Sequence, residues 1–176
     1  YVVNKMGPLI KTPKRDLKKV LTELEPGESW ALQPQNVDGN PYLWTPGIKW
    51  GVRPRSYTHM TEFFGPLLGV MRSDDLDHAI ELVNATGYGL TLGVHSRIED
   101  TWQRVKARAR VGNLYINRNM IGAVVGVQPF GGEGLSGTGP KAGGPLYLYR
   151  FATERTCSAN TAAMGGNAGL LSLPDS

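Results

Sequence analysis

Residues 122–145 read GAVVGVQPFGGEGLSGTGPKAGGP, a run dense in glycine and interrupted by three prolines. Proline removes a backbone donor and glycine weakens regular elements, so the run excludes a long helix or a central strand. A flexible linker is usually polar and Gly/Ser-rich, whereas this run carries aliphatic residues and the aromatic Phe130. Because glycine lets a backbone approach a ligand or a second chain closely, we expect a functional loop here.

The fifty residues before this loop alternate short apolar runs with stretches of helical spacing. The expected elements are strands over 67–71, 90–95 and 114–117, and helices that begin at Asp74 or Asp75 and at Glu99. Gly87 ends the first of these helices. Consecutive strands joined by helices indicate an α/β fold with a mostly parallel sheet, flanking helices and right-handed crossovers.

The N-terminal third predicts one further helix and several short strands. Thr12 fits an N-cap and Pro13 the first helical position. The apolar stripe of this helix is Leu17, Val20, Leu21 and Leu24. Short extended pieces are expected over 30–33 and 42–52, and a last extended run over 146–151.

Composition indicates an ordinary globular chain with a mild basic excess. Its 176 residues, 40% of them apolar, are enough for one domain with a core. The 19 Lys and Arg against 15 Asp and Glu give a net charge of +4, and much of the excess lies on helix-like stretches over 11–19 and 104–110. Solvated helix faces are the favoured interpretation, and a nucleic-acid-binding patch is the alternative.

The chain contains one cysteine, Cys157, which excludes an intrachain disulfide and a cysteine-based zinc cluster. Cys157 lies in a polar tail with no histidine nearby in sequence, so a spectator thiol is favoured over a nucleophile. His59, His78 and His95 show no metal-ligand spacing, and no metal is expected. The cysteine usage and the absence of a signal peptide or long apolar run predict a cytoplasmic protein.

Residues 132–137 read GEGLSG and match the spacing of a dinucleotide-binding fingerprint. That fingerprint must follow a strand and open a helix whose N-terminus binds the pyrophosphate. Pro129 lies just before the motif and Pro140 follows it, so no such helix is expected. We therefore assign the motif to the glycine loop rather than to a nucleotide site.

Residues 61–66 read TEFFGP and come just before an expected strand. Glu62 offers a hydrogen-bond acceptor beside two aromatic rings, which suits the hydroxyl pair of a ribose next to a planar ring. The alternative is a loop carboxylate beside two core phenylalanines. The residues alone leave both interpretations open.

Four motifs taken in order resemble the aldehyde dehydrogenase superfamily. They are EFFGP at 62–66, NATGYGL at 84–90, GNLYIN at 112–117 and QPFGG at 128–132. The run from 126 to 151 and the tail after it are similar to the Δ1-pyrroline-5-carboxylate (glutamate-semialdehyde) dehydrogenase module of bifunctional proline utilisation enzymes. The resemblance implies the C-terminal half of an aldehyde dehydrogenase-like catalytic domain over 1–151, and a C-terminal extension, poorly ordered on its own, over 152–176.

The family oxidises an aldehyde with NAD, through a cysteine thiolate that adds to the carbonyl and a thioester that water hydrolyses. The resemblance implies that Glu62 accepts hydrogen bonds from the nicotinamide ribose and that Phe64 lines the cofactor pocket. It implies that backbone amides of Gly122 and Ala123 bind the substrate α-carboxylate, while Phe130 packs against the aliphatic part of the substrate. Backbone N–H groups can bind an anion without a cation beside them.

The resemblance also implies a longer parent protein. In this family the nucleophilic cysteine, the general base and the dinucleotide-binding domain lie upstream of the region that matches 7–10. We therefore expect a fragment that is inactive alone, whose partners are the rest of the parent polypeptide and a small-molecule substrate.

The expected parent is homo-oligomeric, can be peripheral to the inner membrane, and carries FAD if it has an N-terminal proline dehydrogenase domain. The alternative is a basic nucleic-acid-binding module or an oligomerisation module. The family's DNA-binding element is an N-terminal ribbon-helix-helix outside this chain, so we expect no nucleic acid binding through this segment.

Overall fold

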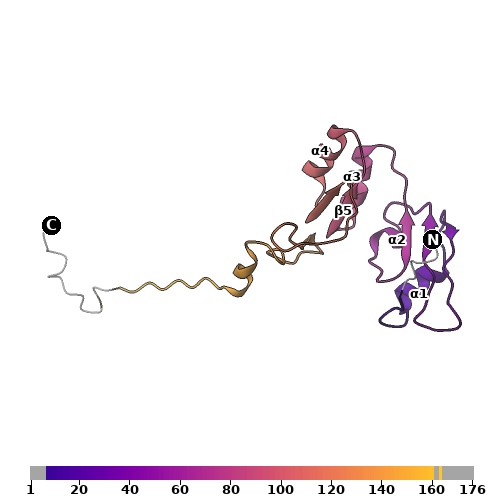
Figure 1. Cartoon of the computed structure of the whole chain (residues 1–176), viewed down its shortest axis with the longest axis horizontal. Coiled ribbons are helices and arrows are strands. Elements are labelled where there is room, and N and C mark those ends of the chain that lie inside the picture. Colours follow the sequence, from indigo (N-terminus) through magenta and orange to yellow (C-terminus); the bar gives the residue numbers. More distant parts are fainter. Residues whose placement is uncertain (1–6, 161–162, 164–176) are drawn as a thin grey trace.

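The structure, a computed structural model, describes residues 7–160 and 163. Two groups of elements follow each other along the chain (Figure 1). The first consists of α1 (Arg15–Thr22), β1 (Ser29–Leu32), β2 (Gly47–Trp50), α2 (Tyr57–Met60) and β3 (Leu67–Val70). The second consists of α3 (Leu76–Ala85), β4 (Tyr88–Gly89), β5 (Thr91–Val94), α4 (Glu99–Arg108), β6 (Asn113–Ile116), β7 (Glu133–Gly134) and the 3₁₀ helix η1 (Tyr147–Phe151).

Two of the four strand pairings are parallel, and the strands do not pair in the expected order. β2 and β3 are parallel, as are β5 and β6, whereas β1–β2 and β4–β7 are antiparallel. The expectation of parallel pairing from β3 through β5 to β6 is wrong for β3, which joins the three-stranded sheet β1-β2-β3. Periodicity identifies strands, but it does not say which neighbour a strand takes.

Helix α1 begins later than Thr12 and Pro13 suggest. Its N-cap is Lys14, whose side chain makes no capping hydrogen bond, so the predicted Thr12 cap is wrong. The helix ends at Thr22 because the chain turns extended at Glu23, and this leaves Leu24 outside the buried stripe and 42% exposed. Val20 and Leu21 supply the buried face, each 1% exposed.

Helices α3 and α4 follow their sequence signals closely. Asp75 caps α3 by accepting a hydrogen bond from the His78 N–H at 2.8 Å, as its position predicts. α4 carries Glu99 in its first turn and Arg108 in its last, the charge order that the helix dipole favours. Asp77 of α3 pairs with both Arg104 and Arg108 of α4, so the two helices are joined by charge.

The prediction of an extended run over 146–151 is wrong, because this segment forms the 3₁₀ helix η1. The turn begins directly after Gly144 and Pro145, where the Tyr147 N–H donates to the Gly144 carbonyl at 3.1 Å. The Tyr147 and Phe151 rings then meet edge to face, with centroids 5.7 Å apart. Contact between residues four apart favours a helical turn over a strand.

His59 connects the two groups of elements. Its Nδ1 accepts the Arg55 N–H at 2.9 Å, and its Nε2 lies 3.0 Å from the Leu82 carbonyl oxygen of α3. Since Nδ1 accepts, Nε2 carries the proton and donates to Leu82. One side chain of α2 therefore holds the first group against the second.

The core is small, and many large apolar side chains lie on the surface. The buried apolar side chains of the described residues are Val20, Leu21, Val52, Ile80, Val105 and Tyr115. The exposed ones include Val125 at 83% and Phe151 at 76% exposure. Within the described part of the chain, no helix has the length and apolar character needed to cross a bilayer.

Candidate functional site

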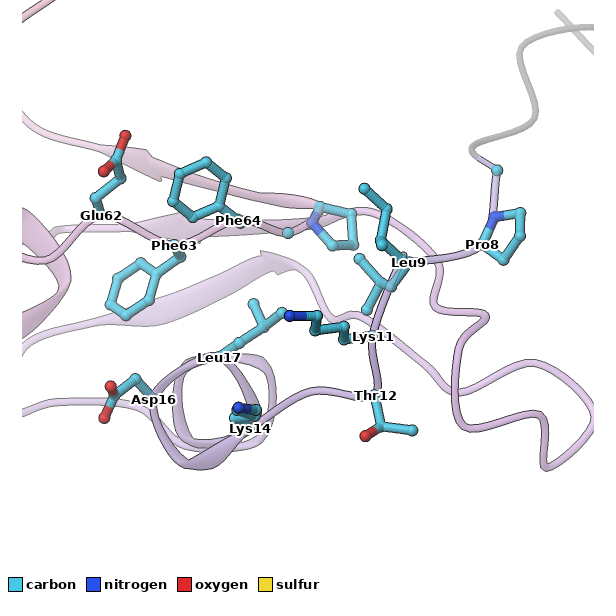
Figure 2. A pocket seen from close by; sticks show the side chains of 14 residues that line it. Pro8, Leu9, Lys11, Thr12, Lys14, Asp16, Leu17, Glu62, Phe63 and Phe64 are labelled. Carbon is cyan, nitrogen blue, oxygen red and sulfur yellow. The ribbon is translucent and has the colours of Figure 1, made fainter. Parts of the chain in front are cut away.

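A cavity of about 940 Å³ opens in the first group of elements, between the segment that leads into α1 and the segment that leads into β3 (Figure 2). Residues 7–12 and the first turn of α1 form one wall, and residues 62–66 form the other. The side chain of Leu17 closes the floor, where it meets Gly65 so closely that a Cβ there would collide with it. The TEFFGP motif is therefore one wall of a cavity.

The extended backbone at 62–66 turns alternate side chains to opposite sides. Figure 2 shows Glu62 and Phe64 on one side, and Phe63 on the other side towards α1. The Phe63 ring packs against Tyr57, with centroids 5.6 Å apart, whereas Phe64 is 83% exposed. The structure thus brings the two predicted cofactor-binding residues onto one face, and it makes Phe63 the packed aromatic.

Glu62 keeps a free carboxylate. The side chain is exposed, and among residues 7–160 and 163 no donor forms a hydrogen bond or ion pair with it. Lys11, Lys14 and Asp16 also line the cavity, so both signs of charge lie near its mouth. An acceptor with free lone pairs beside an exposed ring fits a hydroxylated sugar and a planar base, in a cavity of the size that holds small ligands.

Helix α2 positions this wall, and Glu25 holds α2 in place. The Glu25 carboxylate accepts the Tyr57 N–H at 3.2 Å and the Thr58 N–H at 3.0 Å. Burial raises the pKa of Glu25, but hydrogen bonds from the Thr58 and Tyr57 backbone outweigh it, and the pKa lies below its usual value. Ser56 adds the N-cap by accepting the His59 N–H. These hydrogen bonds hold α2 in place and thereby fix where the segment 62–66 begins.

Beneath α2 lies a buried ion pair that the sequence analysis missed. The Lys49 ammonium lies 2.8 Å from Glu28 Oε2 and 3.3 Å from Thr58 Oγ1, and the side chains of Lys49 and Glu28 are each 1% exposed. The Trp30 ring lies 5.4 Å from the ammonium. The sequence signal for this pair was Lys49 itself, a lysine flanked by apolar residues in a short strand.

The glycine loop presents the second set of predicted residues. Gly122 has φ = +97°, and a Cβ there would meet no atom within 4 Å, so the backbone at this point faces open space. Within the described part of the chain, the N–H groups of Gly122 and Ala123 donate to no acceptor. Phe130 is 42% exposed, and its backbone pairs with Ala142 in both directions at 3.0 and 2.8 Å. Two free backbone donors therefore precede an exposed aromatic.

Asn113 fastens this loop to β6. Its amide nitrogen donates to the Pro129 carbonyl at 3.0 Å, and its amide oxygen accepts from Gly131 N–H and Lys141 Nζ, each at 3.3 Å. Gly112 lies so close to the Gly131 carbonyl that no side chain would fit between them. Sequence analysis did not single out Asn113, although its place at the start of a strand before the loop was visible.

The two sets of predicted residues belong to different parts of the chain. Glu62 and Phe64 line the cavity beside α1, whereas Gly122, Ala123 and Phe130 lie in the loop after β6 and do not line that cavity. Figure 1 shows the loop on the far side of the β5–β6 pair from the first group. The structure therefore presents the two sets as two separate surfaces, and a single cavity does not bring them together.

The remaining sequence motifs lie in turns or in exposed segments. The GEGLSG run forms β7 and a turn and opens no helix. Cys157 is a free, exposed thiol in the stretch after η1. Among residues 7–160 and 163, no three His, Cys, Asp or Glu side chains gather as metal ligands would. The expectation of disorder in the C-terminal extension concerns mainly residues outside the described ones.

Residues 3–157 match the family described as "Aldehyde dehydrogenase family". Over 96 residues, or 53% of the chain, the sequence is 68% identical to the bifunctional protein PutA of Klebsiella aerogenes. The structure of proline utilization A (PutA) from Corynebacterium freiburgense superposes with a TM-score of 0.80 and 43% identity over 91% of the chain. A 1-pyrroline-5-carboxylate dehydrogenase from Thermus with bound NAD superposes with a TM-score of 0.64 and 44% identity over 66% of the chain.

These relatives are much longer than the chain. It covers 7% of the Klebsiella protein, 18% of the Corynebacterium chain and 23% of the Thermus chain. The likeness therefore concerns one segment of each relative.

Proposed function

Because this chain belongs to the aldehyde dehydrogenase family, we propose that it is the C-terminal part of the catalytic domain of an NAD-dependent 1-pyrroline-5-carboxylate (glutamate-semialdehyde) dehydrogenase. The parent oxidises L-glutamate γ-semialdehyde to L-glutamate in proline catabolism. The relatives named PutA and 1-pyrroline-5-carboxylate dehydrogenase support this choice of substrate.

One observation carries the proposal: the free Glu62 carboxylate and the exposed Phe64 ring share one face beside the cavity. NAD, when bound, accepts a hydride from the substrate carbon. Glu62 accepts hydrogen bonds from the two hydroxyls of the nicotinamide ribose, and Phe64 lines the pocket of the ring. Together these two residues would hold and orient the nicotinamide end of the cofactor for hydride transfer.

The glycine loop contributes the substrate site. The N–H groups of Gly122 and Ala123 bind the α-carboxylate, and Phe130 packs against the aliphatic carbons between the two functional groups. Backbone donors with no competing acceptor bind an anion without adding charge to the site. The nucleophilic thiolate and the base that activates water come from the rest of the parent, because the single cysteine, Cys157, is exposed in the stretch after η1.

Replacing Glu62 by glutamine in the full-length enzyme tests the cofactor half of the proposal. The amide retains the shape but loses charge-assisted hydrogen bonds to the ribose, each worth about 1.5–3 kcal/mol. We expect kcat/KM for NAD to fall about tenfold or more, while KM for the aldehyde changes little. Steady-state kinetics with each substrate varied in turn measure this.

Glu81→Gln is the matched control, since Glu81 is an exposed glutamate on α3 away from the cavity. It should leave both Michaelis constants unchanged. Unaltered NAD kinetics in Glu62→Gln would assign that carboxylate to the loop structure alone and remove the main support for the proposal.

A nucleic-acid-binding function gains no support from the geometry. Arg104 and Arg108, two of the cations on the second basic stretch, are both paired with Asp77. Their charge is thereby partly neutralised within the chain, which weakens the attraction to phosphates that such a function needs.

A further inference from the structure

The glycine loop contains a side-chain network that the proposed substrate site does not yet use. The Gln128 residue is half-buried. Its amide group can form hydrogen bonds with both of its polar neighbours in only one of its two orientations. In that orientation the amide nitrogen donates to the Gly122 carbonyl oxygen at 2.9 Å, and the amide oxygen accepts from Arg118 Nη1 at 2.5 Å. One side chain therefore spans the loop from Arg118 to Gly122.

Both ends of this bridge make further contacts. The Arg118 guanidinium lies 5.0 Å from the centroid of the Tyr115 ring, and Tyr115 is a buried residue of β6. The Gln128 backbone is held as well, since its N–H donates to the Val124 carbonyl at 2.7 Å and its carbonyl accepts the Val124 N–H at 3.0 Å. The amide is thus anchored to the sheet on one side and to the turn on the other.

The bond to Gly122 determines where the neighbouring donor points. The carbonyl of Gly122 and the N–H of Ala123 belong to the same peptide unit, and no cis peptide occurs among the described residues. In a trans peptide the carbonyl and the N–H point in opposite directions. Drawing the Gly122 oxygen towards Gln128 therefore turns the Ala123 N–H away from Gln128, and this N–H has no acceptor among the described residues.

We propose that Gln128, held by Arg118, is a positioning residue that orients the Gly122–Ala123 peptide for binding the substrate carboxylate. This rests on the proposed function, because it assumes that the carboxylate binds at these donors. Glycine at 122 has φ = +97° and would rotate readily without a partner for its carbonyl. The network removes that freedom before substrate arrives, which lowers the entropic cost of binding.

The test compares two aldehydes in the full-length enzyme: glutamate semialdehyde, which has the α-carboxylate, and propanal, which lacks it. Gln128→Leu removes both hydrogen bonds at similar size. Gln128→Glu retains the partner for Arg118 but cannot donate to the Gly122 oxygen. Gln33→Leu and Gln33→Glu are the matched controls, because Gln33 is exposed in the first group of elements and lies outside the loop.

We expect Gln128→Leu to raise KM for glutamate semialdehyde by about three- to tenfold, the effect of one lost hydrogen bond. Gln128→Glu should raise it further, because a carboxylate near the site repels the substrate. In both variants kcat, KM for NAD and KM for propanal should remain as in the wild type. A residue that merely supports the fold would change the propanal kinetics as well.

Gly122→Val, which blocks the carboxylate site itself, distinguishes a failure of the positioning role from a failure of the proposed carboxylate site. If Gly122→Val raises KM for glutamate semialdehyde selectively and Gln128→Leu does not, the positioning role is wrong and the substrate site stands. If neither variant distinguishes the two aldehydes while both remain folded by circular dichroism, the carboxylate site is wrong and the positioning role is lost with it. Equal loss with both aldehydes in Gln128→Leu also overturns the positioning role.

Discussion

Lys49 is a charge inside the first group of elements, and its removal should be costly. The Lys49→Met variant leaves the buried Glu28 carboxylate without its ion-pair partner. Breaking such a pair typically destabilises a protein by about 3–5 kcal/mol. We expect a clearly lower thermal midpoint of the full-length enzyme, measured by the loss of circular dichroism and of activity together.

The double variant Lys49→Met with Glu28→Leu is the control for that prediction. Replacing both members of a buried pair by apolar groups is often nearly neutral, so much of the stability should return. If the double variant is no more stable than Lys49→Met, lost packing of the lysine stem rather than the uncompensated carboxylate explains the loss.

Single residues also show why part of the site could be predicted. Glu62 and Phe64 are two apart in an extended segment, so their shared face follows from the backbone alone. Lys49 could not be found in this way, because the burial of a lysine depends on Glu28 and Thr58, which reach it only after the sheet has formed. Gln128 was likewise invisible, since its partners are a side chain and a carbonyl from other parts of the loop.

At the scale of elements, the pairing of α3 with α4 depends on pH. A hydrogen bond from Arg108 holds the pKa of Asp77 below its usual value; burial opposes this, and a second hydrogen bond from Arg104 adds to it. A lowered pKa means that the carboxylate stabilises the folded state above its unfolded pKa, about 3.9. This stabilisation is lost as the pH falls through the lower folded value.

Asp77→Asn should therefore lower the thermal midpoint slightly at pH 7, because the charges are exposed and screened by water. The difference from the wild type should shrink as the pH falls below about 4, because Asp77 of the unfolded wild-type chain then begins to take up a proton that the folded carboxylate still resists. Melting curves from pH 7 to pH 3 measure it. A difference that stays constant over this range would mean that the two arginines do not act through the charge of Asp77.

Helices and strands differ in how well nearby residues in the sequence predict them. α3 and α4 were predictable because Asp75, Gly87 and the acidic first turn of α4 act within a few residues. The strand that pairs with β3 and the 3₁₀ turn of η1 could not be predicted in this way. Strand pairing is decided by contacts distant in sequence, and η1 by Gly144, Pro145 and one ring pair acting together.

For the whole molecule, the proposal predicts that the 176-residue chain alone reduces no NAD with 1-pyrroline-5-carboxylate. Its small core and its many exposed apolar side chains are what we expect of a segment that packs against the rest of a longer parent. Absorbance at the wavelength of NADH measures the outcome, with the full-length enzyme as the positive control. Turnover that disappears in Cys157→Ser would show that Cys157 is the nucleophile and would contradict the proposal.

The β4–β7 pairing also predicts an order of events during folding. The Gly89 N–H donates to Ser136 Oγ, 47 residues further along the chain, and β4 pairs with β7 across a slightly shorter separation. Contacts so distant in sequence need a long loop to close first, which is slow and entropically unfavourable. The β5–α4–β6 unit lies inside that loop, and its contacts are closer in sequence, so we expect it to form earlier. We therefore expect the glycine loop to dock last, after translation has passed residue 136, which would leave it accessible to proteases in a nascent chain for longest.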